Sequence, residues 1–254
     1  MTAHIPYILY DNILNEGTLT ASSEATDKPV SQCVNFLNWN YWEASAAGAA
    51  YVQVDAGAGQ TLTADCVAVC FGQNVGADSG TILIQHSSDA STWTTLVSES
   101  MPERNYFKTF TSANDRYWRV TFTTSTVAVK IPVICLGVKL ELQGLRTGFM
   151  PPNLATPFKS YTTESETGNI LGRSIQREPI TFNIAIDALS ESWIRNYWLP
   201  FLNHAAQKAF FFAWSYDANP TESVFCRVPD DRLDKPAFST RVHMSINLAC
   251  LGEY

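Results

Sequence analysis

Four consecutive residues carry the side chains that a sugar-binding loop uses: Asn38, Trp39, Asn40 and Tyr41. Their aromatic faces can stack on a pyranose ring, and their amide groups can hydrogen-bond to its hydroxyls. The same loop could equally be a contact between subunits. These residues are therefore a candidate binding site for either a glycan or a neighbouring subunit.

Residues arranged for catalysis are not found. The motifs of serine hydrolases, zinc proteases, P-loop enzymes and dinucleotide-binding enzymes are absent, and the four histidines have no carboxylate or cysteine at ligand spacing. Asp230, Asp231 and Asp234 could hold a hard cation or act as an acid pair. However, Pro229 and Pro236 bracket them, which favours a solvated turn. We predict no enzyme activity, no cofactor and no metal site.

The charge of the chain excludes several partners. The net charge is −7, and residues 1–144 hold 7 basic and 13 acidic groups. Neither half is an electrostatic match for nucleic acid. No run of about 18 apolar residues exists, and the first residues lack the features of a secretory signal. We expect no nucleic acid partner, no membrane insertion and synthesis in a cytoplasm.

The six cysteines are interpreted as buried, reduced thiols. No CxxC pair occurs, and Cys66 and Cys70 lie in one strand-like run. At a rise of about 3.3 Å per residue, these two lie roughly 13 Å apart on one face. They cannot pair without a bulge, so they are expected to act as small hydrophobic residues.

Two segments with different patterns suggest two domains. From residue 5 to about residue 143, short β-type runs alternate with turn residues, which is typical of an antiparallel sandwich. Residues 145–177 hold several Gly and Pro residues and few adjacent apolar ones, which indicates a linker or extended arm. We therefore divide the chain into residues 1–144, 145–177 and 178–254.

The last segment combines strands with one helix. Residues 179–187 alternate strictly between apolar and polar, so they predict a half-buried strand. Residues 193–206 then carry apolar side chains at helical spacing, with Ser190 as N-cap, and Pro200 must kink or split this helix. Three more strands are expected near residues 210–214, 224–228 and 238–251. The predicted fold class is mainly β, and here one amphipathic helix packs on an antiparallel sheet.

The first segment resembles discoidin-type domains, which are also called coagulation factor F5/8 type C domains. Six short motifs carry the resemblance in order, including those at residues 19–24, 42–45, 51–57, 84–93, 115–120 and 137–142. The resemblance implies an eight-stranded, galactose-binding-like jelly roll that commonly holds sugars or other partners in loops at one end, sometimes beside a structural calcium ion. It also implies that Trp42 and Trp93 pack in the core. Ala56 and Ala90 depart from the family pattern in the loops.

The last segment is similar in layout to the distal and minor tail proteins of long-tailed bacteriophages. The similarity rests on the order of an alternating strand, a helix, an apolar strand that ends at Trp214, and a final strand pair. It implies a tail-tube-like domain that stacks in a ring. The candidate assembly residues are Trp193, Tyr197, Trp198 and Phe201.

These observations lead to one main functional hypothesis and one alternative. The main hypothesis is a structural protein of a phage virion that forms a ring of six or three subunits. It would join the tail tube to the baseplate or hub and would contact tail fibres or host glycan. The alternative is a freestanding carbohydrate-binding protein.

Overall fold

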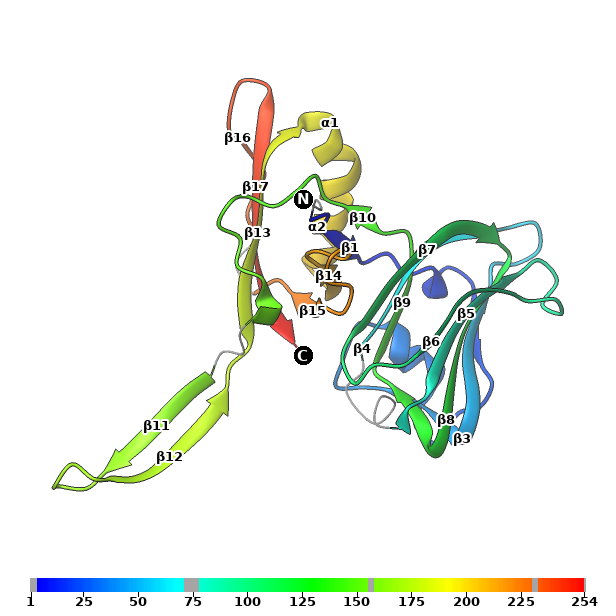
Figure 1. The fold of residues 1–254 in the computed structure, drawn as a ribbon. Helices are drawn as coiled ribbons and strands as arrows, with labels where there is room; N and C mark the ends of the chain where they lie inside the picture. The colour runs from blue at the N-terminus through cyan, green and yellow to red at the C-terminus, as the bar shows by residue number, and fades with distance from the viewer. Residues whose placement is uncertain (1–3, 71–77, 155–157, 230–232, 254) are drawn as a thin grey trace.

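The computed structural model describes residues 4–70, 78–154, 158–229 and 233–253. Antiparallel strands dominate, and they form a jelly roll, a seven-stranded sheet and a separate two-stranded ribbon (Figure 1). The prediction of a mainly β protein is confirmed.

The jelly roll consists of two antiparallel sheets that face each other across a core. The five-stranded sheet has the order β2-β3-β8-β5-β6, and the three-stranded sheet has the order β7-β4-β9. The strands of the first sheet are β2 (Thr18–Ala21), β3 (Trp42–Asp55), β8 (Tyr117–Ile131), β5 (Thr81–Ser87) and β6 (Thr94–Ser100). Those of the second are β7 (Tyr106–Asp115), β4 (Leu62–Cys70) and β9 (Val133–Gly137).

Strict alternation of side chains builds this core. In β8, Trp118, Val120 and Phe122 are fully buried, while Tyr117, Arg119 and Thr121 are only partly covered on the opposite face. Strand residues two apart share a face, so one strand supplies both the core and an outer surface. Trp42 is also fully buried, which confirms its predicted packing role.

The seven-stranded sheet has the order β10-β1-β14-β15-β17-β13, and β16 pairs with β17. Its strands are β1 (Tyr7–Leu9), β10 (Leu140–Glu141), β13 (Ile180–Ser190), β14 (Phe210–Ala213), β15 (Ser223–Arg227), β16 (Ala237–Phe238) and β17 (His243–Glu253). Strands β1 and β10 flank the jelly roll in sequence but pair within this sheet, where Ile8 lies opposite Phe212. The jelly roll is thus inserted between two strands of the other sheet, whereas a boundary at residue 144 assigns both strands to the jelly roll.

One continuous helical segment follows β13. It comprises α1 (Glu191–Trp193), the π-helical η5 (Ile194–Trp198) and α2 (Leu199–Ala205). The side chain of Ser190 accepts a hydrogen bond from the backbone N–H of Trp193, which confirms the predicted N-cap. Pro200 lies in the first turn of α2, directly after the π-helical turn, so the α-helical hydrogen-bond ladder is split beside the residue that lacks an N–H, as predicted. Short 3-10 helices occur at η1 (Ile13–Asn15), η2 (Val30–Val34) and η4 (Pro152–Leu154).

An apolar cluster joins the jelly roll to the seven-stranded sheet. Leu9, Phe211 and Phe225 from the seven-stranded sheet pack against residues of the three-stranded sheet. The jelly-roll members include Cys66, Ala68, Phe107, Val133 and Cys135. Consequently the outer face of the three-stranded sheet is covered, and the outer face of the five-stranded sheet is the exposed one.

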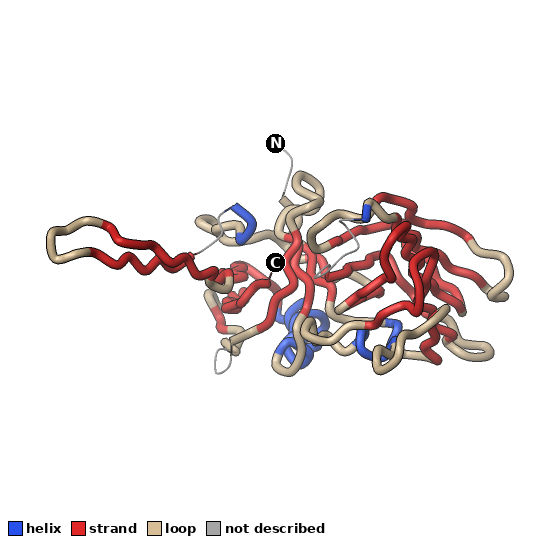
Figure 2. The backbone as a smooth tube through the Cα atoms, turned by 90° about the horizontal axis from the view of Figure 1, so that it is seen from below, coloured by secondary structure: helices blue, strands red, loops and turns tan. Residues whose placement is uncertain are grey.

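Strands β11 (Phe158–Glu164) and β12 (Ile170–Arg177) form a ribbon that projects away from the rest of the molecule (Figure 2). Every residue of β11 is exposed. The segment expected to be a linker or extended arm therefore contains a two-stranded arm.

All six cysteines are buried and free, which confirms their interpretation as reduced thiols. Among the described residues, no helix is long and apolar enough to cross a bilayer.

Candidate functional site

The loop that carries Trp39 begins where η2 ends. Asn35 accepts a hydrogen bond from the backbone N–H of Leu37 over 2.9 Å, which closes the turn. Phe36 has a φ of 62° and is only 4% exposed, so its ring is directed into the protein despite a left-handed backbone. Beyond it, Trp39 is 73% exposed. The turn therefore buries one aromatic ring and presents another to solvent.

Trp39 stands at the edge of a cavity of about 350 Å³. One wall comes from the jelly-roll loop, and the other comes from the end of α2 and from β15. The lining residues are Asn35, Phe36, Leu37, Asn38, Trp39, Ala205, Ala206, Gln207, Lys208, Ala209, Phe225, Cys226, Arg227 and Val228. A volume of this size lies within the usual range of small-molecule pockets.

Polar groups line the wall of this cavity that lies opposite the Trp39 loop. Gln207, Lys208 and Arg227 are exposed, and no ion pair of Lys208 or Arg227 occurs within the described part of the chain. An aromatic face beside amide and cationic donors can stack on a sugar ring and hydrogen-bond to its hydroxyl groups. The arrangement thus supports ligand binding and supplies no nucleophile with a base beside it.

His204 supports the cavity wall through a contact with one of its lining residues. Its Nε2 lies 2.9 Å from the carbonyl oxygen of Ala209, which is a lining residue. Burial lowers the pKa of His204, although the hydrogen bond to the Ala209 carbonyl acts in the opposite direction. The neutral imidazole therefore holds the end of α2 in place.

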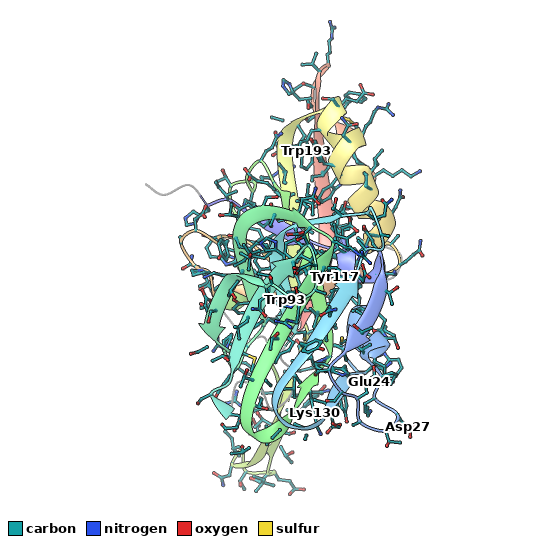
Figure 3. The ribbon with its side chains drawn as sticks, turned by 90° about the vertical axis from the view of Figure 1, so that its right-hand side faces the viewer. Glu24, Asp27, Trp93, Tyr117, Lys130 and Trp193 are labelled. Carbon is teal, nitrogen blue, oxygen red and sulfur yellow. The ribbon has the colours of Figure 1, made fainter. Side chains whose placement is uncertain are left out.

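The structure separates the four predicted loop residues. Asn38 and Trp39 line the cavity, whereas Asn40 and Tyr41 do not. The ring of Tyr41 instead lies between two lysines, with the Nζ of Lys28 at 3.9 Å and that of Lys130 at 5.5 Å from its centroid. Lys130 lies at the same end of the jelly roll as Glu24 and Asp27 (Figure 3). Only half of the tetrapeptide is therefore part of one site.

The four predicted assembly residues fall into two groups, one buried and one at least partly exposed. Trp198 and Phe201 are 1% and 0% exposed and pack in the core between the helix and the seven-stranded sheet. Their assignment to a subunit surface is corrected, because neither side chain reaches solvent. Tyr197 is 53% exposed, and Trp193 is partly buried and lies 6.2 Å from the Tyr197 ring. These two remain candidates for an assembly surface.

Trp93 is not a core residue, contrary to the expectation. It is partly exposed on the outer side of the five-stranded sheet, and its Nε1 donates to the carbonyl of Ala90 over 3.2 Å. Ala90 has a φ of 60°, at the turn where the family pattern has glycine. The turn thus holds the indole ring outside the core.

The acidic cluster lies largely outside the described residues, since Asp230 and Asp231 belong to that part of the chain. Asp234 accepts a hydrogen bond from Asn247 over 3.2 Å. Within the described residues, no three His, Cys, Asp or Glu side chains are grouped so that they could hold a metal ion.

Residues 205–209 and Arg227 were missed by the sequence analysis. The sequence analysis treated residues 1–144 and 178–254 as separate domains. It therefore did not anticipate that residues of the second would line the same cavity as Trp39. One signal was available: all four residues of β14 are apolar, and all four are buried. Such a run indicates a strand that is covered on both faces, which requires a neighbouring layer such as the jelly roll.

The comparisons with known proteins concern the jelly roll. Residues 18–135 match the model of the F5/8 type C domain. The comparison with curated proteins gave no match. Among solved structures, the chain is similar to a chitosan-binding module derived from a chitosanase/glucanase of Paenibacillus sp. IK-5, with 22% identity and a TM-score of 0.41. That match covers 49% of this chain and 97% of the module.

Two further solved structures show a likeness of the same kind. A Clostridium perfringens module, CpGH89CBM32-5, is 8% identical with a TM-score of 0.43, and the match covers 51% of this chain and 99% of the module. The CBM32 module of AlyQ is 21% identical with a TM-score of 0.40, and the match covers 50% of this chain and 96% of the module. Residues 18–135 thus match the F5/8 type C domain model and fold as a galactose-binding-like jelly roll of two facing antiparallel sheets.

Proposed function

We infer that the protein binds a carbohydrate in the cavity beside Trp39. The observation that carries this proposal is the exposed Trp39 ring at the edge of a cavity of about 350 Å³ whose other wall holds Gln207, Lys208 and Arg227. An exposed indole beside convergent amide and cationic donors suits a pyranose, which has an apolar face and a polar rim.

Two features support a glycan over other ligands. The site lies on a loop of an F5/8 type C domain, a class that commonly holds sugars in loops at one end of the jelly roll. The lining carries no catalytic pair, so binding without turnover is the simplest activity for these groups. Because both walls are needed, the carbohydrate would be bound by the whole chain rather than by the jelly roll alone.

Calorimetric titration of the full chain with neutral galacto- and gluco-oligosaccharides tests the proposal. We expect the Trp39→Ala variant to bind at least about tenfold more weakly, or about 1.4 kcal/mol, because it removes the aromatic face on which the apolar face of the sugar would pack. Tyr197→Ala is the matched control, since Tyr197 is also an exposed aromatic residue but does not line the cavity. Equal affinity of wild type and Trp39→Ala would refute the site.

A second candidate function is the assembly role proposed for a phage tail, and one observation supports its self-association step. The arm of β11 and β12 carries five large apolar side chains that are 52% to 69% exposed: Phe158, Tyr161, Ile170, Leu171 and Ile175. An isolated two-stranded ribbon is at best marginally stable in water. Packing of the arm on a neighbouring copy of the chain would cover these side chains and would fit a ring-forming virion component.

Mass measurement in solution and electron micrographs test this second role. Rings of six or three subunits that disappear when residues 158–177 are replaced by a short Gly-Ser linker would support assembly. A monomer at all concentrations, with or without the arm, would count against self-assembly and would leave glycan binding as the function.

A further inference from the structure

The outer face of the five-stranded sheet holds an arginine between two aromatic rings. Arg119 projects from β8 on the face opposite the buried Trp118 and Val120. Its guanidinium carbon lies 3.9 Å from the ring centroid of Trp93 and 5.2 Å from that of Tyr51. Trp93 lies on the face that is turned toward the viewer in Figure 3. The cation is thus held at a surface that the rest of the chain leaves open.

Neighbouring strands fix the orientation of this guanidinium. The Nε and Nη2 of Arg119 donate to Oε1 of Gln85 over 3.1 and 2.7 Å. Nε2 of Gln85 in turn donates to Oγ1 of Thr95 over 3.0 Å. Because β8, β5 and β6 are adjacent strands, the group is oriented before any ligand arrives.

No carboxylate pairs with Arg119 within the described part of the chain. By contrast, Arg116, Arg146 and Arg195 each form an ion pair with a carboxylate. The acceptor that Arg119 uses, the Gln85 amide, is neutral. Burial lowers the pKa of Arg119, because removing the charged guanidinium from water costs free energy. No Asp or Glu side chain of the described residues offsets this desolvation cost. Both hydrogens of Nη1 remain available as donors.

A second amide extends the polar row across the sheet. Gln53 of β3 lies opposite Arg119 in the strand register, and Gln85 lies opposite Arg119 on the other side. The side chain of Gln53 is partly exposed and has no hydrogen-bond partner among the described residues. Two amides and a guanidinium therefore form one row, and Tyr51 and Trp93 flank it.

We propose that this row is a second carbohydrate-binding surface, distinct from the cavity beside Trp39, and that it selects sugars that carry an anionic group. A carboxylate or a sulfate ester accepts hydrogen bonds from the free N–H groups of Arg119, which is the geometry that guanidinium favours. The exposed edges of Trp93 and Tyr51 contact the apolar face of the same ring, and Gln53 bonds to its hydroxyls. The proposal rests on Arg119 and does not depend on the cavity.

Titrations with three oligosaccharides of equal length test this surface: an oligogalacturonate, a sulfated galactan fragment and a neutral galactan fragment. They are made with the full chain carrying Trp39→Ala, so that the cavity does not contribute. We expect at least one anionic oligosaccharide to bind about tenfold or more tightly than the neutral one, with an affinity that falls as salt rises. The preferred oligosaccharide identifies carboxylate or sulfate as the group that is recognised.

Variants of Arg119 separate recognition from a structural role. Arg119→Gln should lower the affinity for the preferred oligosaccharide at least tenfold, and Arg119→Lys should give an intermediate value because it keeps the charge but not the planar fork. Lys28→Gln is the matched control, since it removes the same charge from a lysine that also lies over an aromatic ring. Equal binding of neutral and anionic oligosaccharides, or unchanged affinity in a less stable Arg119→Gln variant, would overturn the proposal.

Discussion

The ring of Phe36 meets the imidazole of His204 edge-on, with 5.0 Å between their centroids. Phe36 belongs to the jelly roll and His204 to α2, so this contact joins the two halves of the chain. It also adjoins the cavity, because Phe36 is one of the lining residues. This contact therefore adds to the apolar cluster that fixes the Trp39 loop relative to the opposite wall.

At position 36, we expect a glycine variant to be more stable than an alanine variant, which is the reverse of the usual order. Phe36→Ala removes a buried ring, which typically costs about 3–5 kcal/mol of unfolding free energy. Phe36→Gly removes the same ring but relieves the positive φ, which costs a residue with a Cβ roughly 1–2 kcal/mol. Urea denaturation should therefore find the glycine variant more stable than the alanine variant. Greater stability of the alanine variant would show that this turn changes its backbone.

Acid should weaken the folded state through His204. Burial holds its pKa in the folded state below the ordinary value of 6.5, so the unfolded chain binds the proton more readily. Stability from this group is complete above about pH 6.5 and falls as the pH drops from there toward the depressed pKa. In urea titrations at pH 7.5 and pH 5.5, wild type should lose more stability than His204→Gln, which cannot titrate. The same loss in both proteins would exclude His204 as the cause.

A methyl group at Gly137 should be poorly tolerated. A Cβ at this position would lie 2.2 Å from the backbone oxygen of Asp11, and backbone atoms cannot move aside easily. We expect Gly137→Ala to cost at least about 1–3 kcal/mol, as for other overpacked sites. In Gly172→Ala the new Cβ meets nothing within 4 Å, so thermal unfolding should change little. Similar losses in both variants would contradict this account.

Two buried tryptophans offer a matched test of a hydrogen bond. Trp118 and Trp198 are both almost completely buried, but only the Nε1 of Trp118 donates, to the carbonyl of Leu62 over 3.0 Å. The Nε1 of Trp198 has no partner among the described residues. Trp118→Phe should therefore cost about 1–3 kcal/mol more than Trp198→Phe, because it removes a buried hydrogen bond, whereas Trp198→Phe removes an N–H without a partner among the described residues. Denaturant unfolding of the two variants measures the difference, and equal costs would argue against it.

Local patterns were enough to predict most of the strands and the helix. The alternation of residues 180–186 and the N-cap at Ser190 both describe short-range preferences, and the structure confirms both. Periodicity also placed Trp198 and Phe201 on one face of the helix, but it does not say whether that face meets the core or another subunit. Burial in the chain's own core decided this point.

Long-range pairing was the part that the sequence did not reveal. Tyr7 lies opposite Ala213 and also opposite Glu141, and neither partner is marked by any local motif. The candidate site was predicted only in part for the same reason. Trp39 was identified from the residue types of its loop, whereas Gln207 and Arg227 on the opposite wall of the cavity were not identified. A wall that is assembled from distant segments depends on sheet order, which residue patterns within one segment do not specify.

The insertion of the jelly roll between β1 and β10 has a consequence for synthesis of the chain. Strand β1 is made first, but its partner Phe212 follows Ile8 by about 200 residues. At roughly 5–20 residues per second, the ribosome needs on the order of 10–40 s to deliver that partner. The jelly roll can fold during this interval, before β14 has been synthesised and can pair with β1. A nascent chain arrested before residue 210 would thus carry a finished jelly roll and a strand β1 that can pair with β10 on one edge but has no partner on the other.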